Sequence, residues 1–206
     1  MKRRIFLEEF PLSQPSVRDG VLRRLLPADL GGFRDHLLRL DAQSRRSRFG
    51  MEASDAFVMA YADRCSGIDD VIYGFVADGV VRAAGELRGI GHNLPLGFGG
   101  NAEAAFSVEI DWRRRGIGAQ LMGRIVRAAR NRRAQTLYMS CLANNEPMLR
   151  LARKFSAQLR FEPEPAHGEV APRAPTPATF LGEAADDAAG FATAMMDLHR
   201  RSFELR

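Results

Sequence analysis

The chain has 206 residues, of which 46% are hydrophobic and 27% charged, a composition typical of a folded globular protein rather than a disordered one. No segment approaches the ~20 apolar residues of a membrane span, so no membrane partner is expected. The two cysteines, Cys65 and Cys141, lie far apart and form no metal-ligand spacing. We therefore expect a reduced, cytoplasmic protein without a metal.

Arginine carries nearly all of the positive charge in a chain of net charge +5, because Lys2 and Lys154 are the only lysines. A guanidinium group grips phosphates with a fixed fork of donors, which favours a partner that contains phosphate. Nucleic acid is not favoured as that partner, because the sequence shows no aromatic–basic alternation, no helix-turn-helix and no zinc pattern.

The N-terminal part begins with an extension, residues 1–20, that is rich in proline and serine. Residues 21–26 predict a strand, and Pro27 suits the start of a helix. The apolar residues of that helix recur at helical spacing, at Leu30, Phe33, Leu37 and Leu40. Ser54 is the predicted N-cap of a second helix that ends near Arg64.

A hairpin follows, in which residues 71–76 and 80–87 are strands joined by the turn signal Asp78-Gly79. Residues 89–100 form a glycine-dense segment. This segment is interpreted as a surface connection, with a mobile rim over a substrate mouth as the alternative.

The middle of the chain reads as strand, helix, strand, at residues 104–110, 117–131 and 136–142. The helix places an apolar face opposite its arginines, made of Leu121, Met122, Ile125 and Ala129. A further helix opens near Asn145, with a buried stripe of Met148, Leu151, Ala152 and Phe155. The interleaving of strands and helices predicts a mixed α/β sheet layered by helices.

The C-terminal part is predicted to contain a short strand at residues 159–162 and then a segment rich in proline and alanine as far as Pro177. The main domain is expected to span residues 21–177, and residues 178–206 to form a helical extension. Its amphipathic part, from Glu183 to Arg206, is expected to turn four apolar residues inward: Phe191, Met195, Leu198 and Phe203. This helix either covers the sheet or mediates a homodimer.

The loop from Arg113 to Ala119 has the form R-x-x-G-x-G and lies where a strand passes into a helix. Backbone N–H groups at such a helix start have no partner within the helix, so they suit an anion such as a phosphate. The loop is not a dinucleotide fingerprint, because Leu121 stands where a third glycine is expected. The lysine-serine ending of a nucleoside-triphosphate loop is also absent.

This order of elements resembles the GNAT superfamily of acetyl-coenzyme A-dependent N-acetyltransferases. Three segments also resemble the GNAT domains of bacterial protein lysine acetyltransferases: residues 40–49 follow the pattern L-x-x-x-S-x-x-x-R-F, Ala102-Glu103-x-Ala105-Phe106 the pattern A-E-x-A-F, and Asn145-x-x-Met148-Leu149 the start of the next helix. The resemblance implies a mostly antiparallel central sheet with a V-shaped splay and helices on both faces. It also implies acetyl-coenzyme A as cosubstrate and an amine as acceptor.

In that family the loop amides hold the coenzyme pyrophosphate, which assigns this role to Arg113, Arg114, Arg115, Gly116, Ile117, Gly118 and Ala119. The family also implies that the preceding strand pairs its backbone with the pantetheine arm, at Phe106, Val108 and Ile110. Asn145 matches the asparagine that touches the coenzyme arm. Gly116 and Gly118 are expected to be the sterically required positions of the loop.

Glu103 is the candidate general base, because the glutamate of the A-E-x-A segment has that role in the subgroup. A lysine-type amine has a pKa near ~10.4 and attacks only when neutral, so a carboxylate that takes its proton is needed. Apart from the resemblance, the residue alone would suit a solvated position at the start of a strand.

Two features depart from the family pattern. The usual tyrosine, the acid for the departing thiolate, falls on Ala152, and the usual Gly-Phe is Ser156-Ala157. Tyr138, Ser140 and Cys141 are replacement candidates on the neighbouring strand, and His92 is a minor candidate in the glycine-dense segment. These departures leave a non-catalytic acyl-coenzyme A-binding or sensor domain as the rival to an N-acetyltransferase, and a nucleic-acid-binding protein as a third interpretation.

Overall fold

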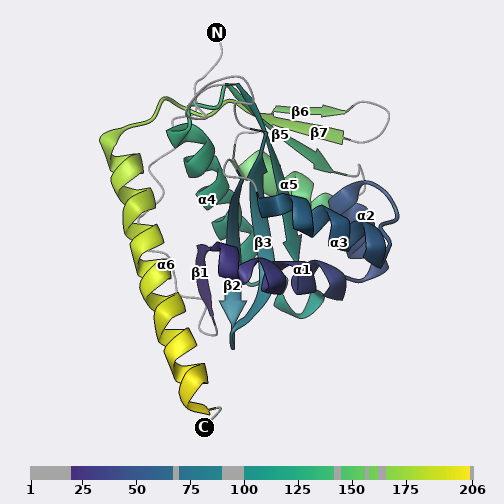
Figure 1. The fold of residues 1–206 in the computed structure, drawn as a ribbon. Coiled ribbons are helices and arrows are strands. Elements are labelled where there is room, and N and C mark those ends of the chain that lie inside the picture. The colour runs from purple at the N-terminus through teal and green to yellow at the C-terminus, as the bar shows by residue number, and fades with distance from the viewer. Residues whose placement is uncertain are drawn as a thin grey trace.

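The structure is a computed structural model that describes residues 20–66, 70–89, 100–141, 145–155, 158–161 and 166–204. Its centre is a seven-stranded sheet in the order β1-β2-β3-β4-β5-β7-β6 (Figure 1). The strands are β1 (Val21–Arg24), β2 (Val71–Ala77), β3 (Val80–Arg88), β4 (Asn101–Val108), β5 (Thr136–Cys141), β6 (Gln158–Phe161) and β7 (Ala166–Val170). All neighbouring strands pair antiparallel except β4 and β5, which run parallel.

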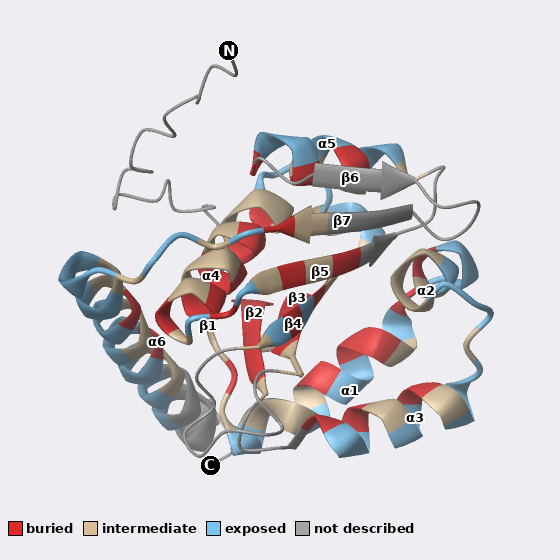
Figure 2. Cartoon of the chain, turned by 90° about the horizontal axis from the view of Figure 1, so that it is seen from above, coloured by how far each residue is buried: buried red, intermediate tan, exposed pale blue. Residues whose placement is uncertain are grey.

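Helices cover both faces of this sheet. The α-helices are α1 (Leu30–Arg39), α2 (Ala42–Phe49), α3 (Asp55–Asp63), α4 (Ile117–Asn131), α5 (Glu146–Lys154) and α6 (Pro177–Glu204). Helices α1, α2 and α3 lie on one face and α4 and α5 on the other, while α6 runs along the edge formed by β1 (Figure 2). The mixed α/β sheet with helices on both faces, predicted from the sequence, is confirmed.

Each face of the sheet has its own hydrophobic core. On the α4 face the predicted stripe is fully buried, at Leu121, Met122, Ile125 and Ala129. On the α1 face Phe33 and Leu37 are fully buried, as their helical spacing predicted. Side chains alternate along β4 in the same way, so Ala102 and Ala104 enter the α4 core while Glu103 faces the side of α1 to α3.

The hairpin of β2 and β3 turns at Asp78 and Gly79, whose φ angles of 50° and 70° are both left-handed. Two successive residues with positive φ make the turn type that matches the twist of the paired strands. The hairpin predicted from the Asp-Gly pair is therefore confirmed. The predicted N-cap of α3 is confirmed as well, because Ser54 Oγ accepts the Phe57 N–H at 3.2 Å.

Strands β4 and β5 begin as a parallel pair and then separate. Their register runs from Asn101 opposite Thr136 to Ala104 opposite Met139, although β4 continues to Val108. Over the same stretch β4 stays paired with β3, and β5 with β7. The inner edges of the two strands therefore part after Ala104, which is the V-shaped splay expected from the family resemblance.

Helix α2 and strand β7 were not predicted from the sequence, and one predicted strand, β4, is displaced. Helix α2 has no apolar stripe, because Ser44 is its buried residue, and β7 lies within the segment rich in proline and alanine. The strand predicted at residues 104–110 was wrong at both ends, since β4 is Asn101–Val108 and Ile110–Trp112 is a 3-10 turn, η3. Ile110 is 58% exposed in that turn and has left the strand.

Helix α6 was expected to turn apolar residues inward, and this expectation was wrong for the residues that can be compared. Phe191 and Met195 are about half exposed, at 54% and 49%. Among the α6 side chains that the structure describes, the buried residues are instead Glu183 and Gly190. The side chains of Leu198 and Phe203 lie outside the described residues.

The neighbours of α6 explain its orientation, because β1 and α4 present arginines to it. Arg132 Nη1 lies 2.8 Å from Glu183 Oε1, and both Arg124 and Arg127 pair with Asp186. The acidic face of the helix therefore meets the protein while apolar residues remain outside. Within the described ranges, no helix is both long enough and apolar enough to cross a membrane.

Candidate active site

The loop before α4 leaves the N-terminus of this helix without a side-chain cap. Arg114 and Gly116 both have left-handed φ angles, 64° and 81°, so the chain folds back sharply before Ile117. The first helical bonds run from the amides of Ala119 and Gln120 to the Gly116 carbonyl, each at 3.1 Å. Gly116 supplies no side-chain cap, unlike the N-cap residues of α2, α3 and α5, which are Asp41, Ser54 and Asn145. The amides at the start of α4 can therefore receive an external anion.

The two glycines of the loop have different structural requirements. Gly116 is needed for its left-handed φ, since a Cβ there would meet nothing within 4 Å. At Gly118 a Cβ would make only ordinary contact with Leu151 Cδ2, at 3.8 Å. The protein fold alone therefore does not require glycine at residue 118, and a steric need there depends on a bound phosphate, which stays a prediction.

The edge of β4 at the splay presents the backbone of Phe106 and Val108. The Glu109 N–H donates to the Arg82 carbonyl of β3 at 3.0 Å, so the amides of alternate residues point toward β3. The N–H and C=O groups of Phe106 and Val108 then point the other way, toward the gap beside β5. This is the orientation that pairing with an extended ligand requires. Ile110, predicted as a third such residue, lies outside the strand.

Arg113 links this edge to helix α2. Its Nε donates to the Val108 carbonyl at 3.1 Å, and its Nη2 donates to Ser44 Oγ at 2.6 Å. Ser44 in turn bonds Asp41, which caps the start of α2. The serine of the L-x-x-x-S-x-x-x-R-F stretch therefore braces the loop that precedes α4, and the guanidinium of Arg113 is held by the protein.

Glu103 lies within β4 on the face that α1, α2 and α3 cover. It is exposed, and its register partners are Arg88 on β3 and Tyr138 on β5. Register partners on neighbouring strands share a face of the sheet. The opposite face is fixed independently, because Leu137 and Met139 are buried in the α4 core. Glu103 and Tyr138 therefore lie side by side, one step before the strands separate.

Next to Arg88, Glu103 and Tyr138, a buried cluster of charged side chains supports β3. Glu86 is fully buried and pairs with Arg48, while Tyr61 Oη donates to Glu86 Oε2 at 2.8 Å. Arg88 lies over the Tyr61 ring at 4.2 Å and contacts Cys65. Burial raises the pKa of the Cys65 thiol to about 12, so this cysteine stays protonated. The arginine of the L-x-x-x-S-x-x-x-R-F stretch thus fixes α2 and α3 to the sheet.

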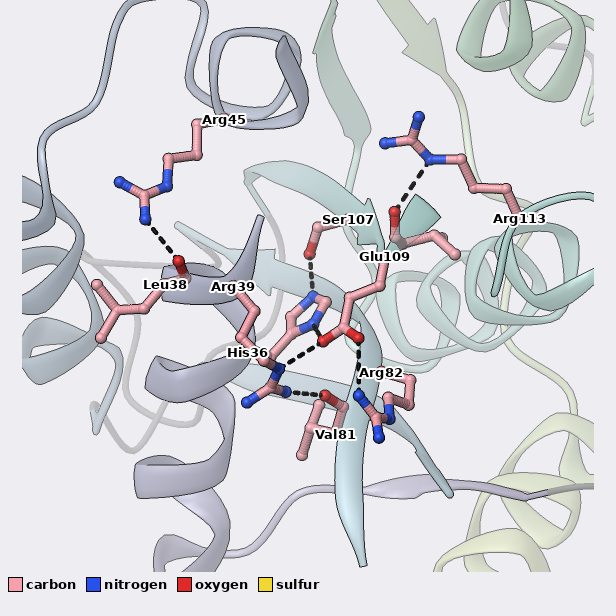
Figure 3. Close-up of polar contacts among 10 residues, drawn as sticks. His36, Leu38, Arg39, Arg45, Val81, Arg82, Ser107, Glu109 and Arg113 are labelled. Atoms are coloured by element: carbon pink, nitrogen blue, oxygen red, sulfur yellow. Dashed lines mark hydrogen bonds and ion pairs between the residues drawn. The ribbon is translucent and has the colours of Figure 1, made fainter. Parts of the chain in front are cut away.

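A second polar network, missed in the sequence, closes the end of β4 (Figure 3). The buried ring of His36 lies between β4 side chains, with Nδ1 at 3.2 Å from Glu109 Oε1 and Nε2 at 2.8 Å from Ser107 Oγ. Glu109 also accepts from Arg39 Nε at 2.9 Å and from Arg82 Nη1 at 3.1 Å. Glu109 is therefore held by the side chains of His36, Arg39 and Arg82.

The network has a definite protonation state. Burial lowers the pKa of His36, and the neighbouring Glu109 offsets this only in part, so the ring is neutral. A carboxylate only accepts, so Nδ1 donates to Glu109 and Nε2 accepts from Ser107. Burial alone would raise the pKa of Glu109, but the bonds from His36, Arg82 and Arg39 hold it at about 2. The carboxylate is therefore a fixed anion that anchors the chain before η3.

The predicted coenzyme contact of Asn145 and the tyrosine position map to helix α5. Asn145 Oδ1 accepts the Met148 N–H at 3.2 Å and caps the helix, which leaves its Nδ2 as a donor. Ala152, which stands at the tyrosine position of the family, is 2% exposed and packs in the α4 core. This position therefore supplies no hydroxyl group to the splay.

Several candidates cannot be placed. His92 and Ser156-Ala157 lie outside the described residues, as do the side chains of Ser140 and Cys141. Among the described residues, no group of three or more His, Cys, Asp or Glu side chains is arranged to hold a metal ion.

Comparison with solved structures supports the fold. The GNAT domain of S. lividans PAT is 19% identical over 74% of this chain and 90% of its own, with a TM-score of 0.62. A cAMP-binding acyltransferase from Mycobacterium smegmatis is 22% identical over 84% of this chain and 52% of its own, with a TM-score of 0.53. The acetyl-CoA-bound yncA, a putative acetyltransferase from Salmonella typhimurium, is 13% identical over 77% of this chain and 96% of its own, with a TM-score of 0.53. A search of curated proteins gave no match.

Residues 35–157 match the family model described as acetyltransferase (GNAT) family, and these residues include the loop before α4, the splay and Glu103. Enzymes of this family take their acetyl group from acetyl-coenzyme A. This chain belongs to the GNAT family of acetyltransferases.

Proposed function

We propose that this protein transfers the acetyl group of acetyl-coenzyme A to a primary amine, on a protein lysine or a small molecule. The amine attacks the thioester directly while both substrates are bound, so no covalent enzyme intermediate is needed. The observation that carries this proposal is the place of Glu103, one residue before the last pair of β4 and β5 and beside the gap where the two strands separate.

The residues around the gap fit the coenzyme. The uncapped start of α4 suits a pyrophosphate, held by the amides of residues 114–118, because the N–H groups of Arg113 and Ala119 already donate to the carbonyls of Ile110 and Gly116. On the edge of β4, the backbone of Phe106 and the N–H of Val108 suit the amides of the pantetheine arm, and these N–H groups can polarise the thioester carbonyl. The Val108 carbonyl already accepts from Arg113. Asn145 retains a donor at the neighbouring helix start for the same arm. Ile110 is not retained in this role.

Glu103 removes the proton that makes the amine a nucleophile. The free amine of a lysine has a pKa near ~10.4 and is almost wholly charged at neutral pH. The carboxylate is exposed on the face opposite the α4 core, so an amine can reach it, directly or through one water. The acetyl group then passes to the nitrogen that faces Glu103.

The test compares Glu103→Gln with Glu52→Gln, which removes another exposed carboxylate, outside the sheet. Thiol release from acetyl-coenzyme A is measured with a panel of peptides containing lysine and of small primary amines, and coenzyme binding by calorimetry. We expect Glu103→Gln to lower kcat by about 10²- to 10⁴-fold. Coenzyme affinity should be unchanged in this variant, and Glu52→Gln should behave as the wild type.

The alanine at position 152 keeps a non-catalytic acyl-coenzyme A-binding domain as the second candidate. That domain would bind acetyl-coenzyme A and acetylate no amine of the panel. Equal turnover by wild type and Glu103→Gln would instead preserve the enzyme and exclude Glu103 as the base.

A further inference from the structure

Tyr138 is the phenol that lies at the splay. The chain has three tyrosines, and the other two have structural partners: Tyr61 Oη donates to Glu86, and Tyr73 Oη reaches Glu183 of α6 at 3.5 Å. Tyr138 is half-buried and faces away from the α4 core, because its neighbours Leu137 and Met139 both enter that core. It therefore lies on the same face as Glu103.

The register makes Tyr138 and Glu103 direct neighbours. They are opposite one another in the parallel pair of β4 and β5, and only Ala104 and Met139 are paired beyond them before the strands part. Neighbouring strands lie about 4.8 Å apart, so both side chains extend from the base of the gap. The carboxylate of Glu103 and the phenol of Tyr138 thus lie side by side on one face of the sheet, next to the gap.

Resting on the proposed function, we propose that Tyr138 is a second catalytic residue, the acid that protonates the sulfur of the departing coenzyme. The first proton that Glu103 removes, from the ammonium form of the amine, passes to solvent. The neutral amine nitrogen then forms a bond to the acetyl carbon, and the carbon–sulfur bond breaks with its electron pair on sulfur. Glu103 takes the proton that nitrogen loses, and Tyr138 gives its hydroxyl proton to sulfur. The proton on Glu103 then returns to the tyrosinate beside it, which restores both groups.

The charged groups on this face fit that cycle. Arg88 lies opposite Glu103 on β3, and Glu169 lies opposite Tyr138 on β7. Tyr138 therefore stands between two carboxylates, Glu103 and Glu169, with Arg88 one strand further away. The proton carried by Glu103 therefore has a short path back to the Tyr138 oxygen on the neighbouring strand.

Other groups are worse placed for the same step. Ala152 is buried and has no proton to give. Burial raises the pKa of the Cys65 thiol to about 12, and this thiol lies against Arg88 of β3 rather than at the gap between β4 and β5. Tyr61 is held by Arg48 and Glu86 at the base of α3.

The first test compares Tyr138→Phe with Tyr73→Phe, which loses a phenol hydroxyl away from the site. We expect kcat of Tyr138→Phe to fall by about 10²-fold while KM for acetyl-coenzyme A stays within about threefold of wild type. The fall in kcat at alkaline pH, where the phenol loses its proton, should also disappear. Tyr73→Phe should keep wild-type kinetics and the alkaline limb.

A second test reads binding rather than turnover and preserves the phenol. With 3-fluorotyrosine at position 138, the fluorine resonance should shift on adding coenzyme A and hardly move with desulfo-coenzyme A, which has the same anchor without sulfur. The same substitution lowers the phenol pKa, so the alkaline limb of kcat should move to lower pH. This variant decides the question where Tyr138→Phe folds poorly.

The results separate the two proposals. If the wild type acetylates an amine while Tyr138→Phe keeps its kcat and pH profile, or if both coenzymes shift the fluorine resonance equally, Tyr138 is not the acid although the enzyme stands. If the wild type binds acetyl-coenzyme A and acetylates nothing, the proposed function and the role of Tyr138 both fail.

Discussion

Arg113 donates to Ser44 Oγ at 2.6 Å, and this contact joins helix α2 to the loop that opens α4. The two residues are 69 positions apart in the chain. The same guanidinium holds the carbonyl of Val108, at the end of β4. Helix α2, which lies on the same face of the sheet as Glu103, therefore helps to set the shape of the loop to which we assign the pyrophosphate.

Removing that hydroxyl should loosen the loop. Ser44→Ala leaves one guanidinium donor of Arg113 without its partner, and a hydrogen bond to a charged group contributes about 2 kcal/mol. We expect a lower melting temperature and a several-fold weaker affinity for acetyl-coenzyme A, both measured by calorimetry. Ser47→Ala makes the same chemical change on α2 and should alter neither quantity. Unchanged affinity in Ser44→Ala would show that the contact does not shape the loop.

Alanine substitutions at two glycines with similar backbone angles distinguish the cost of backbone strain from a loss of coenzyme binding. Gly116 and Gly50 have φ of 81° and 73°, and a Cβ on either would meet nothing within 4 Å. Alanine in the left-handed region costs about 1 kcal/mol, so Gly116→Ala and Gly50→Ala should destabilise the fold to a similar degree. Only Gly116→Ala should weaken acetyl-coenzyme A binding, because Gly50 ends α2 and is not part of the loop. Parallel losses of affinity in both variants would contradict the assignment of the loop.

Acid should destabilise the protein through His36 and Glu109. Burial lowers the pKa of His36 below 6.5, and the bonds to Glu109 hold its pKa at about 2, below its ordinary 4.5. Both groups bind protons more readily when unfolded, so their contribution is complete above the unfolded pKa and is lost as pH falls toward the folded pKa. The free energy of unfolding should therefore decline below pH 6.5 for His36 and below pH 4.5 for Glu109.

His36→Gln tests the first part of that decline. Glutamine does not titrate, so the variant should lose less stability than the wild type between about pH 7 and about pH 5, although it starts from a lower value. Thermal unfolding across this range gives the slope. His199→Gln, which changes an exposed histidine of α6, should keep the wild-type slope. An identical slope in His36→Gln would mean that folding does not change the pKa of the ring.

Gly190 allows α6 to approach β1. A Cβ at this position would lie 2.7 Å from Arg23 Cβ, closer than side chains tolerate. We expect Gly190→Ala to displace the helix, lower the melting temperature and expose α6 to hydrogen exchange, despite the higher helix propensity of alanine. Met196→Ala changes a residue that is 65% exposed on the outer face and should leave exchange unchanged. Protection of α6 in Gly190→Ala equal to wild type would contradict this packing.

The sequence by itself determined the elements whose signals are local. The Asp-Gly turn, the cap at Ser54, the apolar stripe of α4 and the glycines before it each depend on residues within a few positions, because capping, turn formation and helical periodicity act over that range. The family pattern added Glu103 and the splay. These signals were enough for the fold class and for the loop before α4.

Only the tertiary structure decided which distant side chains meet. His36 reaches Ser107 across 71 positions, and Arg48 reaches Glu86 across 38, so no local pattern shows either pair. The same holds for α6, whose acidic face turns inward because arginines of α4 and β1 lie there. Periodicity identifies the apolar face of a helix, but the charge of the surface it meets decides which face is buried.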